Sequence, residues 1–240
     1  MDSILARAAE NTPSKDGKRK QMSLTRTVYL RLRDEILTCK LAPGLEISEA
    51  ELAQQFEVSK TPVREALAQL RQEGLVRTFP RRGYQISPIT FGDMNELFDL
   101  RTILEAGAAE LACEQITDDM LVELRELAVV AYEKEETQTI ANFIAANRRF
   151  HIAIAAASGN SRLVNILARQ IDELERFFYI GAQMRDVNSE TNIDHLEIVD
   201  ALARRDRKAA RDLMVRHNDL TRQGLFQSLA MSRQAGTISL

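Results

Sequence analysis

The chain has 240 residues, of which 45% are hydrophobic and 28% are charged, and its formal net charge is −3. This composition is that of an ordinary globular protein with one large or two small domains, and it excludes fibrous and disordered classes. No apolar stretch approaches the roughly 18 residues of a membrane span, and the start of the chain lacks the apolar core of a signal peptide. Cys39 and Cys113 imply no disulfide framework. We therefore expect a cytoplasmic protein with no membrane partner.

The charge is distributed unevenly along the chain. Residues 1–90 contain 15 Lys and Arg against 11 Asp and Glu, whereas residues 91–240 contain 17 against 24. A basic N-terminal part favours a polyanionic partner there, although an excess of this size is also within ordinary scatter.

The first residues differ in pattern from those that follow. Residues 1–22 have no apolar period and include the basic run Lys18-Arg19-Lys20, which predicts a flexible basic tail. From Thr25 apolar residues recur at helical spacing, and this helix should end near Lys40 because Pro43 and Gly44 follow.

The next segment predicts two further helices and a hairpin. Ser48, with Glu51 three residues later, forms a capping box for a short helix. A second helix should begin at Ser59 and end at Gly74, and two short β-prone runs then flank a turn that contains Pro and Gly. This order of elements predicts a winged helix-turn-helix domain over residues 23–88.

The remainder of the chain, residues 91–231, has an almost wholly helical pattern. We expect helices near 91–115, 117–133, 137–158, 161–181, 189–204 and 206–230. The predicted fold class is therefore mainly α, with the winged helix-turn-helix domain followed by an all-α antiparallel helical bundle.

The second helix of the turn motif begins with residues suited to DNA. The hydroxyls of Ser59 and Thr61 can donate to phosphate. Lys60 and Arg64 are four residues apart, so they share a helix face and can reach phosphate or guanine. The backbone N–H groups at the helix start also favour phosphate. We expect this turn to enter the major groove of double-stranded DNA.

The predicted hairpin carries further positive charge at its tip. Arg81, Arg82 and Gly83 suit a wing that enters the adjacent minor groove, where glycine permits close approach. The alternative is a winged helix that contacts proteins and whose arginines are merely solvated. Cations at both the helix start and the wing tip favour DNA.

Residues from about 28 to 87 resemble the DNA-binding domain of the GntR family. The matching strings are Leu41-Ala42-Pro43-Gly44, Ser48-Glu49-Ala50-Glu51-Leu52-Ala53, Val58-Ser59-Lys60-Thr61-Pro62-Val63-Arg64-Glu65-Ala66-Leu67, Leu70, Glu73-Gly74-Leu75-Val76 and Arg82-Gly83-Tyr84. The resemblance implies DNA contacts by Lys60, Thr61, Arg64 and Gly83. Ala50 stands where the family often has a DNA-contacting arginine, so one family contact is missing here.

The only three histidines of the chain all fall in the predicted bundle. His151, His195 and His217 each lie on an apolar stripe, so all three should face a common interior. Asn147 is one turn before His151 on the same face. Neutral imidazoles are good ligands for zinc or nickel, which favours a shared metal or ligand pocket. Separate hydrogen-bonded core histidines are the alternative.

Residues 91–225 resemble the FCD domain, the C-terminal ligand-binding domain of the FadR subgroup. The matching pieces are Leu97-Phe98-Asp99-Leu100-Arg101 with Glu105, Asn147-Arg148-Arg149-Phe150-His151, His195 through Ile198 to Ala201, and His217. The resemblance implies that His151, His195 and His217 bind a divalent metal, zinc or nickel. Asn147 replaces the aspartate that is a further metal ligand in metal-binding members, so it is a weaker fourth ligand or an effector contact.

The same resemblance implies a small-molecule effector, an organic acid, on the open side of the metal. Arg101 can pair with the carboxylate of this effector. A salt bridge from Arg101 to Glu105, four residues on, is the equal alternative.

These patterns together predict a homodimer that places two winged helices on a pseudo-palindromic operator. The effector changes the affinity for DNA, most often lowering it, as in a repressor. One rival is a metal-dependent helical-bundle enzyme, but the sequence offers no carboxylate motif placed as a general base, and Asn147 removes the best candidate. A binding module without metal is the other rival.

Overall fold

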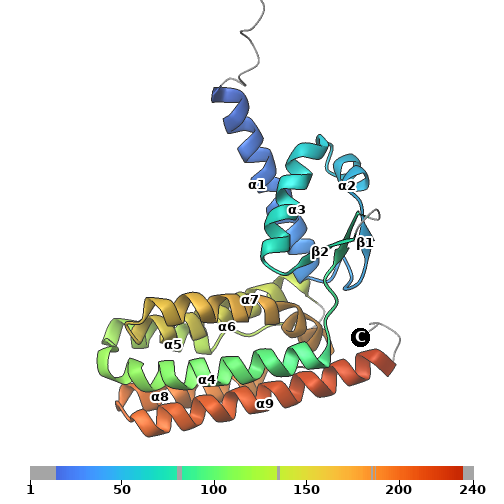
Figure 1. The fold of residues 1–240 in the computed structure, drawn as a ribbon. Coiled ribbons are helices and arrows are strands. Elements are labelled where there is room, and N and C mark those ends of the chain that lie inside the picture. The colour runs from blue at the N-terminus through green and yellow to red at the C-terminus, as the bar shows by residue number, and fades with distance from the viewer. Residues whose placement is uncertain (1–14, 80–82, 134–135, 185, 187, 235–240) are drawn as a thin grey trace, which may run out of the picture. The chain divides into compact units, whose positions relative to one another are not determined.

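The computed structural model describes residues 15–79, 83–133, 136–184, 186 and 188–234 (Figure 1). Over these residues the chain is mainly helical with one small sheet, which confirms the expected fold class. The chain divides into two compact units. One contains residues up to 34 together with 46–85, and the other contains 35–45 together with 86–240.

In its described residues the first unit has three helices and a three-stranded sheet. Its elements are most of α1 (Lys15–Leu37), β1 (Glu46–Ile47), α2 (Glu49–Gln55), α3 (Lys60–Gln72), β2 (Val76–Phe79) and β3 (Gly83–Ile86). The strand order is β1-β3-β2, and β1 pairs antiparallel with β3 so that Glu46 lies opposite Gln85. This is the predicted helix-turn-helix followed by a hairpin, with β1 added at the edge of the sheet.

Local signals in the sequence explain how α2 and α3 begin. Ser48 and Glu51 form the predicted capping box of α2, since the side chain of each accepts a hydrogen bond from the backbone of the other. Ser59 is the N-cap residue of α3, but its side chain makes no capping hydrogen bond. Val63 and Leu67 are fully buried beneath this exposed first turn, so the core fixes the orientation of the helix start.

The predicted tail was wrong over residues 15–22, because α1 begins at Lys15 rather than near Thr25. The segment lacks an apolar period, but lysine, arginine, methionine and glutamine all have good intrinsic helix propensity and can form a helix without one. Residues 1–14 lie outside the described part of the chain. Further along α1, Thr25 and Tyr29 donate hydrogen bonds to Glu65 and Glu73 at 2.6 and 2.7 Å, which joins this helix to α3 and the residue after it.

The second unit is a bundle of six helices over its described residues. They are α4 (Phe91–Gln115), α5 (Asp118–Ala128), α6 (Thr137–Ala157), α7 (Ser161–Met184), α8 (Asn188–Ala203) and α9 (Arg207–Gln234). Each predicted helix is present, and the second ends at Ala128 rather than near 133. Helix α4 packs along α9 and also against α6 and α7 (Figure 1). Within the described ranges no helix has the length and apolar character needed to cross a membrane.

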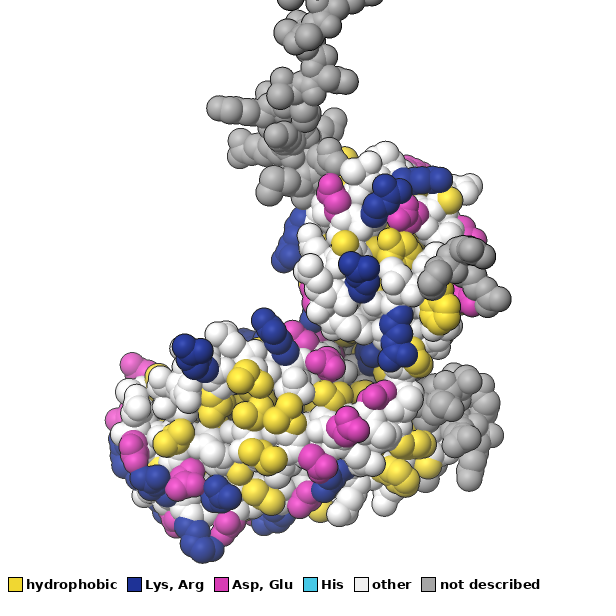
Figure 2. Space-filling model, in the orientation of Figure 1, with side chains coloured by type: hydrophobic (Ala, Val, Ile, Leu, Met, Phe, Trp, Pro, Cys, Tyr) yellow, Lys and Arg dark blue, Asp and Glu magenta, His cyan; other side chains and the backbone are white. Residues whose placement is uncertain are grey.

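Helix α4 has two apolar faces. One face enters the core with Phe98 and Ala109, and on this buried face lie two charged residues, Arg101 and Glu105. The other face leaves Ile103 71% exposed, with Leu100 and Leu111 also exposed. Figure 2 shows hydrophobic side chains gathered on the surface over α4 and α7. A contiguous exposed apolar surface of this kind is typical of an interaction site.

Candidate functional site

The first turn of α3 exposes the polar residues that the sequence singled out. Ser59, Lys60, Thr61 and Arg64 are all exposed, whereas Val63 between them is buried. The helical period therefore directs the hydroxyls and cations to solvent at the N-terminal end of one helix. This arrangement offers hydrogen-bond donors and positive charge to an anionic partner.

Arg64 is held by a carboxylate that the sequence analysis did not assign. Its Nε donates to Glu49 Oε1 at 3.0 Å, and its Nη2 donates to Oε2 at 2.7 Å. The Tyr84 hydroxyl also donates to Glu49 Oε1, at 3.2 Å. Arg64 lowers the pKa of Glu49, so this carboxylate stays ionised. The network connects α2, α3 and β3, and sequence could not reveal it because the partners are 15 and 35 residues from Glu49.

Gly83 has a structural reason to be glycine. Its φ is +97°, and a Cβ atom at this position would lie 2.9 Å from the carbonyl oxygen of Ile47 in β1. Both the left-handed backbone and the close approach of the neighbouring strand therefore favour glycine. The predicted wing cations Arg81 and Arg82 lie outside the described residues.

The three histidines meet in the interior of the second unit. His151 comes from α6, His195 from α8 and His217 from α9, and each is at most 2% exposed. One ring nitrogen of each lies within 4.8 Å of the other two. The ring of His195 also stacks on Phe150, with the two centroids 3.9 Å apart. Their separate apolar stripes thus converge on one cluster, as predicted.

Two of the imidazoles have a carboxylate behind them. Glu105 Oε2 lies 3.2 Å from Nδ1 of His151, and Asp194 Oδ2 lies 3.5 Å from Nδ1 of His217. These contacts favour a proton on each Nδ1 and a lone pair on each Nε2, although neither contact has the geometry of a hydrogen bond. Burial lowers the pKa of His151 to about 4 against the opposing effect of Glu105, so the ring is neutral at pH 7. Burial also lowers the pKa of His195, whose Nε2 has no hydrogen-bond partner.

Arg101 is completely buried and pairs with Glu105. Its Nε donates to Glu105 Oε1 at 2.9 Å, which is the salt bridge that the spacing allowed. Asn218 donates to the other carboxylate oxygen at 3.0 Å. Burial acts to raise the pKa of Glu105, but Arg101 and His151 together outweigh it and lower the pKa, so the carboxylate stays ionised. The Nη2 atom of Arg101 lies 2.7 Å from Nε2 of His151.

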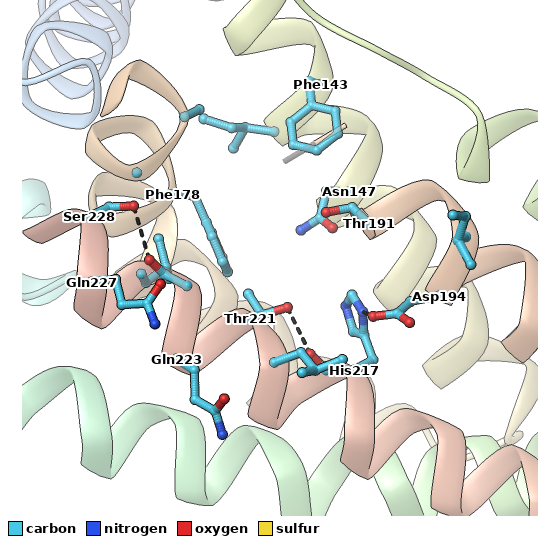
Figure 3. Close-up of a pocket in the computed structure, with 17 residues that line it drawn as sticks. Phe143, Asn147, Phe178, Thr191, Asp194, His217, Thr221, Gln223, Gln227 and Ser228 are labelled. Atoms are coloured by element: carbon cyan, nitrogen blue, oxygen red, sulfur yellow. Dashed lines mark hydrogen bonds and ion pairs between the residues drawn. The ribbon is translucent and has the colours of Figure 1, made fainter. Parts of the chain in front are cut away.

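A cavity of about 480 Å³ adjoins the histidine cluster (Figure 3). Asn147, Thr191, Asp194 and His217 gather at one end of it, and Gln227 and Ser228 lie at the other. The apolar part of the wall includes the following side chains: Phe143, Ile144, Phe178, Leu220 and Leu225. Within the described residues no lysine or arginine lines the cavity, so Arg101 is not a wall residue there.

The donor set of the cluster fits a divalent metal such as zinc or nickel. Three histidines whose ring nitrogens lie this close together are typical metal ligands, and carboxylates behind Nδ1 are the usual partners that orient them. The unpaired Nε2 of His195 is a buried polar atom that such an ion would satisfy. Asn147 lines the same cavity as His217, so its side chain lies at this end of the site.

Comparison with known proteins agrees with both halves of this description. Residues 24–86 match the gntR family of bacterial regulatory proteins, and residues 96–220 match the FCD domain family. A helix-turn-helix transcriptional regulator from an unstable DNA locus of Streptomyces ambofaciens is 32% identical over 192 residues, which is 80% of each chain. The Escherichia coli transcriptional repressor RspR is 26% identical over 190 residues, or 79% of this chain and 83% of that one.

A solved structure has the same fold over most of its length. The E. coli protein McbR/YncC superposes with a TM-score of 0.69 at 23% identity, covering 86% of this chain and 98% of that one. The order of the helix-turn-helix, the hairpin and the helical bundle thus corresponds to two adjoining families of known regulators. The chain belongs to the GntR family of bacterial transcriptional regulators and carries an FCD domain as its C-terminal part.

Proposed function

We propose that the protein binds an operator in double-stranded DNA through the first turn of α3 and that a ligand in its helical unit changes this binding. The observation that carries the proposal is the exposure of Lys60, Thr61 and Arg64 at one helix N-terminus. Lys60 and Arg64 would reach guanine edges or phosphate, and Ser59 and Thr61 would donate to phosphate. Arg81, Arg82 and Gly83 would form the minor-groove wing.

The protein would act as a homodimer through the outer face of α4. Leu100, Ile103 and Leu111 are exposed on this face, and burying them against a second copy would remove apolar surface from water. A two-fold dimer would present two copies of α3 to a pseudo-palindromic operator.

Zinc or nickel would be held by His151, His195 and His217, with Asn147 as a neutral fourth ligand. A bound ion would supply a positive charge at the end of the cavity where Asn147 and Asp194 lie. Glu105 and Asp194 would orient two of the imidazoles. Asn147 donates less charge than an aspartate would, so the metal affinity should be moderate.

The effector would occupy the 480 Å³ cavity. An organic acid with an apolar body suits it, because Phe143, Phe178 and Leu225 line the middle and polar groups lie at both ends. Since no lysine or arginine of the described residues lines the wall, the carboxylate would depend on the metal, or on Arg101 if that side chain moved. Effector binding would lower DNA affinity, as in a repressor, and the relative RspR is named a repressor.

The test is a mobility-shift titration of promoter fragments with the full-length protein at moderate salt. The wild type should bind a specific fragment, and the double variant K60A/R64A should not. R71A is the matched control, because Arg71 is exposed in the last turn of the same helix. Equal binding by wild type and K60A/R64A would refute the proposal. Adding the metal and candidate acids to the same titration tests the ligand response.

A further inference from the structure

A guanidinium nitrogen lies at the atom that a metal would use. Nη2 of Arg101 is 2.7 Å from Nε2 of His151, and both side chains are buried. A guanidinium has only donors, so Nε2 of His151 must accept this hydrogen bond. The lone pair of Nε2 is therefore directed at Arg101, and a metal ion bound by His151 would need the same lone pair.

The other nitrogen of the ring cannot take over this role. Nδ1 of His151 lies 3.2 Å from Glu105 Oε2. Because Nε2 accepts a hydrogen bond, the single ring proton is on Nδ1, and Nδ1 therefore has no lone pair for a metal. Moving the proton from Nδ1 to Nε2 would leave the lone pair of Nδ1 against the carboxylate, which is repulsive. Nε2 is thus the nitrogen that is available both to Arg101 and to a metal.

We propose that Arg101 and the divalent metal exclude each other at Nε2 of His151, so that Arg101 is an internal competitor that limits metal uptake. The inference rests on the proposed function, in which the three histidines hold the metal. Beyond blocking the lone pair, the positive charge of Arg101 would repel a dication in this buried setting.

The guanidinium that a metal would displace already lies next to a wall residue of the cavity. Its Nη1 has no hydrogen-bond partner, and its Nε remains anchored to Glu105. The guanidinium carbon lies 5.4 Å from the ring centre of Phe178, and Phe178 lines the cavity. Metal uptake would therefore move a cation beside the cavity wall, which links metal binding to the affinity for an acidic ligand.

The test compares metal affinity in variants of the full-length protein that keep the net charge of the cluster. After treatment with a chelator, nickel or zinc is titrated in competition with a chromophoric chelator. R101M/E105Q removes one positive and one negative charge, and the glutamine can still hydrogen-bond to Asn218. We expect this variant to bind metal at least about tenfold more tightly than E105Q, which lacks the same carboxylate but retains Arg101; this ratio is roughly 1.4 kcal/mol. Equal or weaker binding would overturn the inference.

The single variant E105Q separates the two residues, because it retains Arg101. It should bind metal no more tightly than the wild type. If E105Q gains as much affinity as R101M/E105Q, Glu105 and not Arg101 limits the metal and the inference fails. If neither the wild type nor R101M/E105Q binds metal, the metal site of the proposed function itself is wrong.

A crystal structure of the wild-type protein with zinc gives a test that needs no variant. The inference predicts zinc on Nε2 of His151, with Arg101 Nη2 moved out of hydrogen-bond distance. Zinc held by the other two histidines, with the hydrogen bond between Arg101 and His151 intact, would contradict it.

Discussion

The first turn of α3 and the histidine cluster use similar groups in opposite surroundings. Lys60 and Arg64 are exposed, whereas Arg101 and His151 are almost completely inaccessible to solvent. Water solvates an exposed cation, so Lys60 contributes little to stability, and the exposed ion pair of Arg64 with Glu49 also contributes little. A buried cation needs a partner at all times, so Arg101 is tied to Glu105. Substitutions of polar residues at the start of α3 should therefore change DNA binding alone. Substitutions in the histidine cluster should also change the free energy of unfolding.

The largest expected effect comes from removing one partner of the buried pair. E105A would leave Arg101 uncompensated in the core and should lower the free energy of unfolding by about 3–5 kcal/mol. Urea denaturation of the metal-stripped protein measures this. D99A is the control on the same helix, because Asp99 forms an exposed ion pair with Arg222 and should cost less than about 1 kcal/mol. Equal losses of unfolding free energy in E105A and D99A would contradict the contrast between buried and exposed charges.

Metal should stabilise the folded protein by an amount that depends on the cluster. Zinc or nickel at 100 times its dissociation constant should add about 2.7 kcal/mol, which raises Tm by several degrees and is reversed by a chelator. At the same metal concentration, H195A should abolish this shift, whereas N147D should enlarge it because a carboxylate is a stronger ligand and lowers the dissociation constant. Thermal unfolding with and without metal checks all three proteins. An unchanged shift in H195A would show that the metal binds elsewhere.

Changes at the start of α3 should leave stability alone. K60A should weaken operator binding by about 1–3 kcal/mol if Lys60 contacts a base edge. If Lys60 contacts phosphate instead, K60A should reduce by about one the slope of the logarithm of the binding constant against the logarithm of the salt concentration. Its free energy of unfolding should change by no more than about 0.5 kcal/mol. Fluorescence anisotropy at several salt concentrations and urea denaturation give the two values. A large loss of unfolding free energy in K60A would show that Lys60 stabilises the fold.

The smallest expected effect concerns Glu49, which holds Arg64 in place. E49Q removes a negative charge beside the proposed phosphate site and releases Arg64, so DNA affinity should rise a few-fold, about 0.5–1 kcal/mol. The same anisotropy titration measures it, with R71A as the reference for an unrelated charge change. A fall in affinity would show instead that Glu49 orients Arg64 for binding.

Much of this architecture could be predicted from short-range patterns. The Ser48 and Glu51 spacing, Pro62 in a first turn and Gly74 after a helix each act within a few residues, and they located α2 and α3. The apolar stripes placed the three histidines inward, because burial follows helical period. The start of α1 was missed since residues 15–22 have no apolar period in the sequence.

Contacts between distant segments could not be predicted in the same way. Sequence spacing left two partners open for Arg101, and only the packing of α4 against α6 brings its guanidinium to His151, 50 residues away. The carboxylate of Asp194 behind His217 likewise depends on how α8 meets α9. No local pattern identifies such pairs, because their geometry is set by helix packing.

The most direct test of the central claim is an in vitro selection of genomic DNA fragments with the full-length protein, run in parallel with K60A/R64A. The wild type should enrich fragments that share a pseudo-palindromic sequence, K60A/R64A should lose them, and R71A should retain them. Enrichment of the same fragments by wild type and K60A/R64A, or no enrichment by either, would contradict an operator-binding role for the first turn of α3.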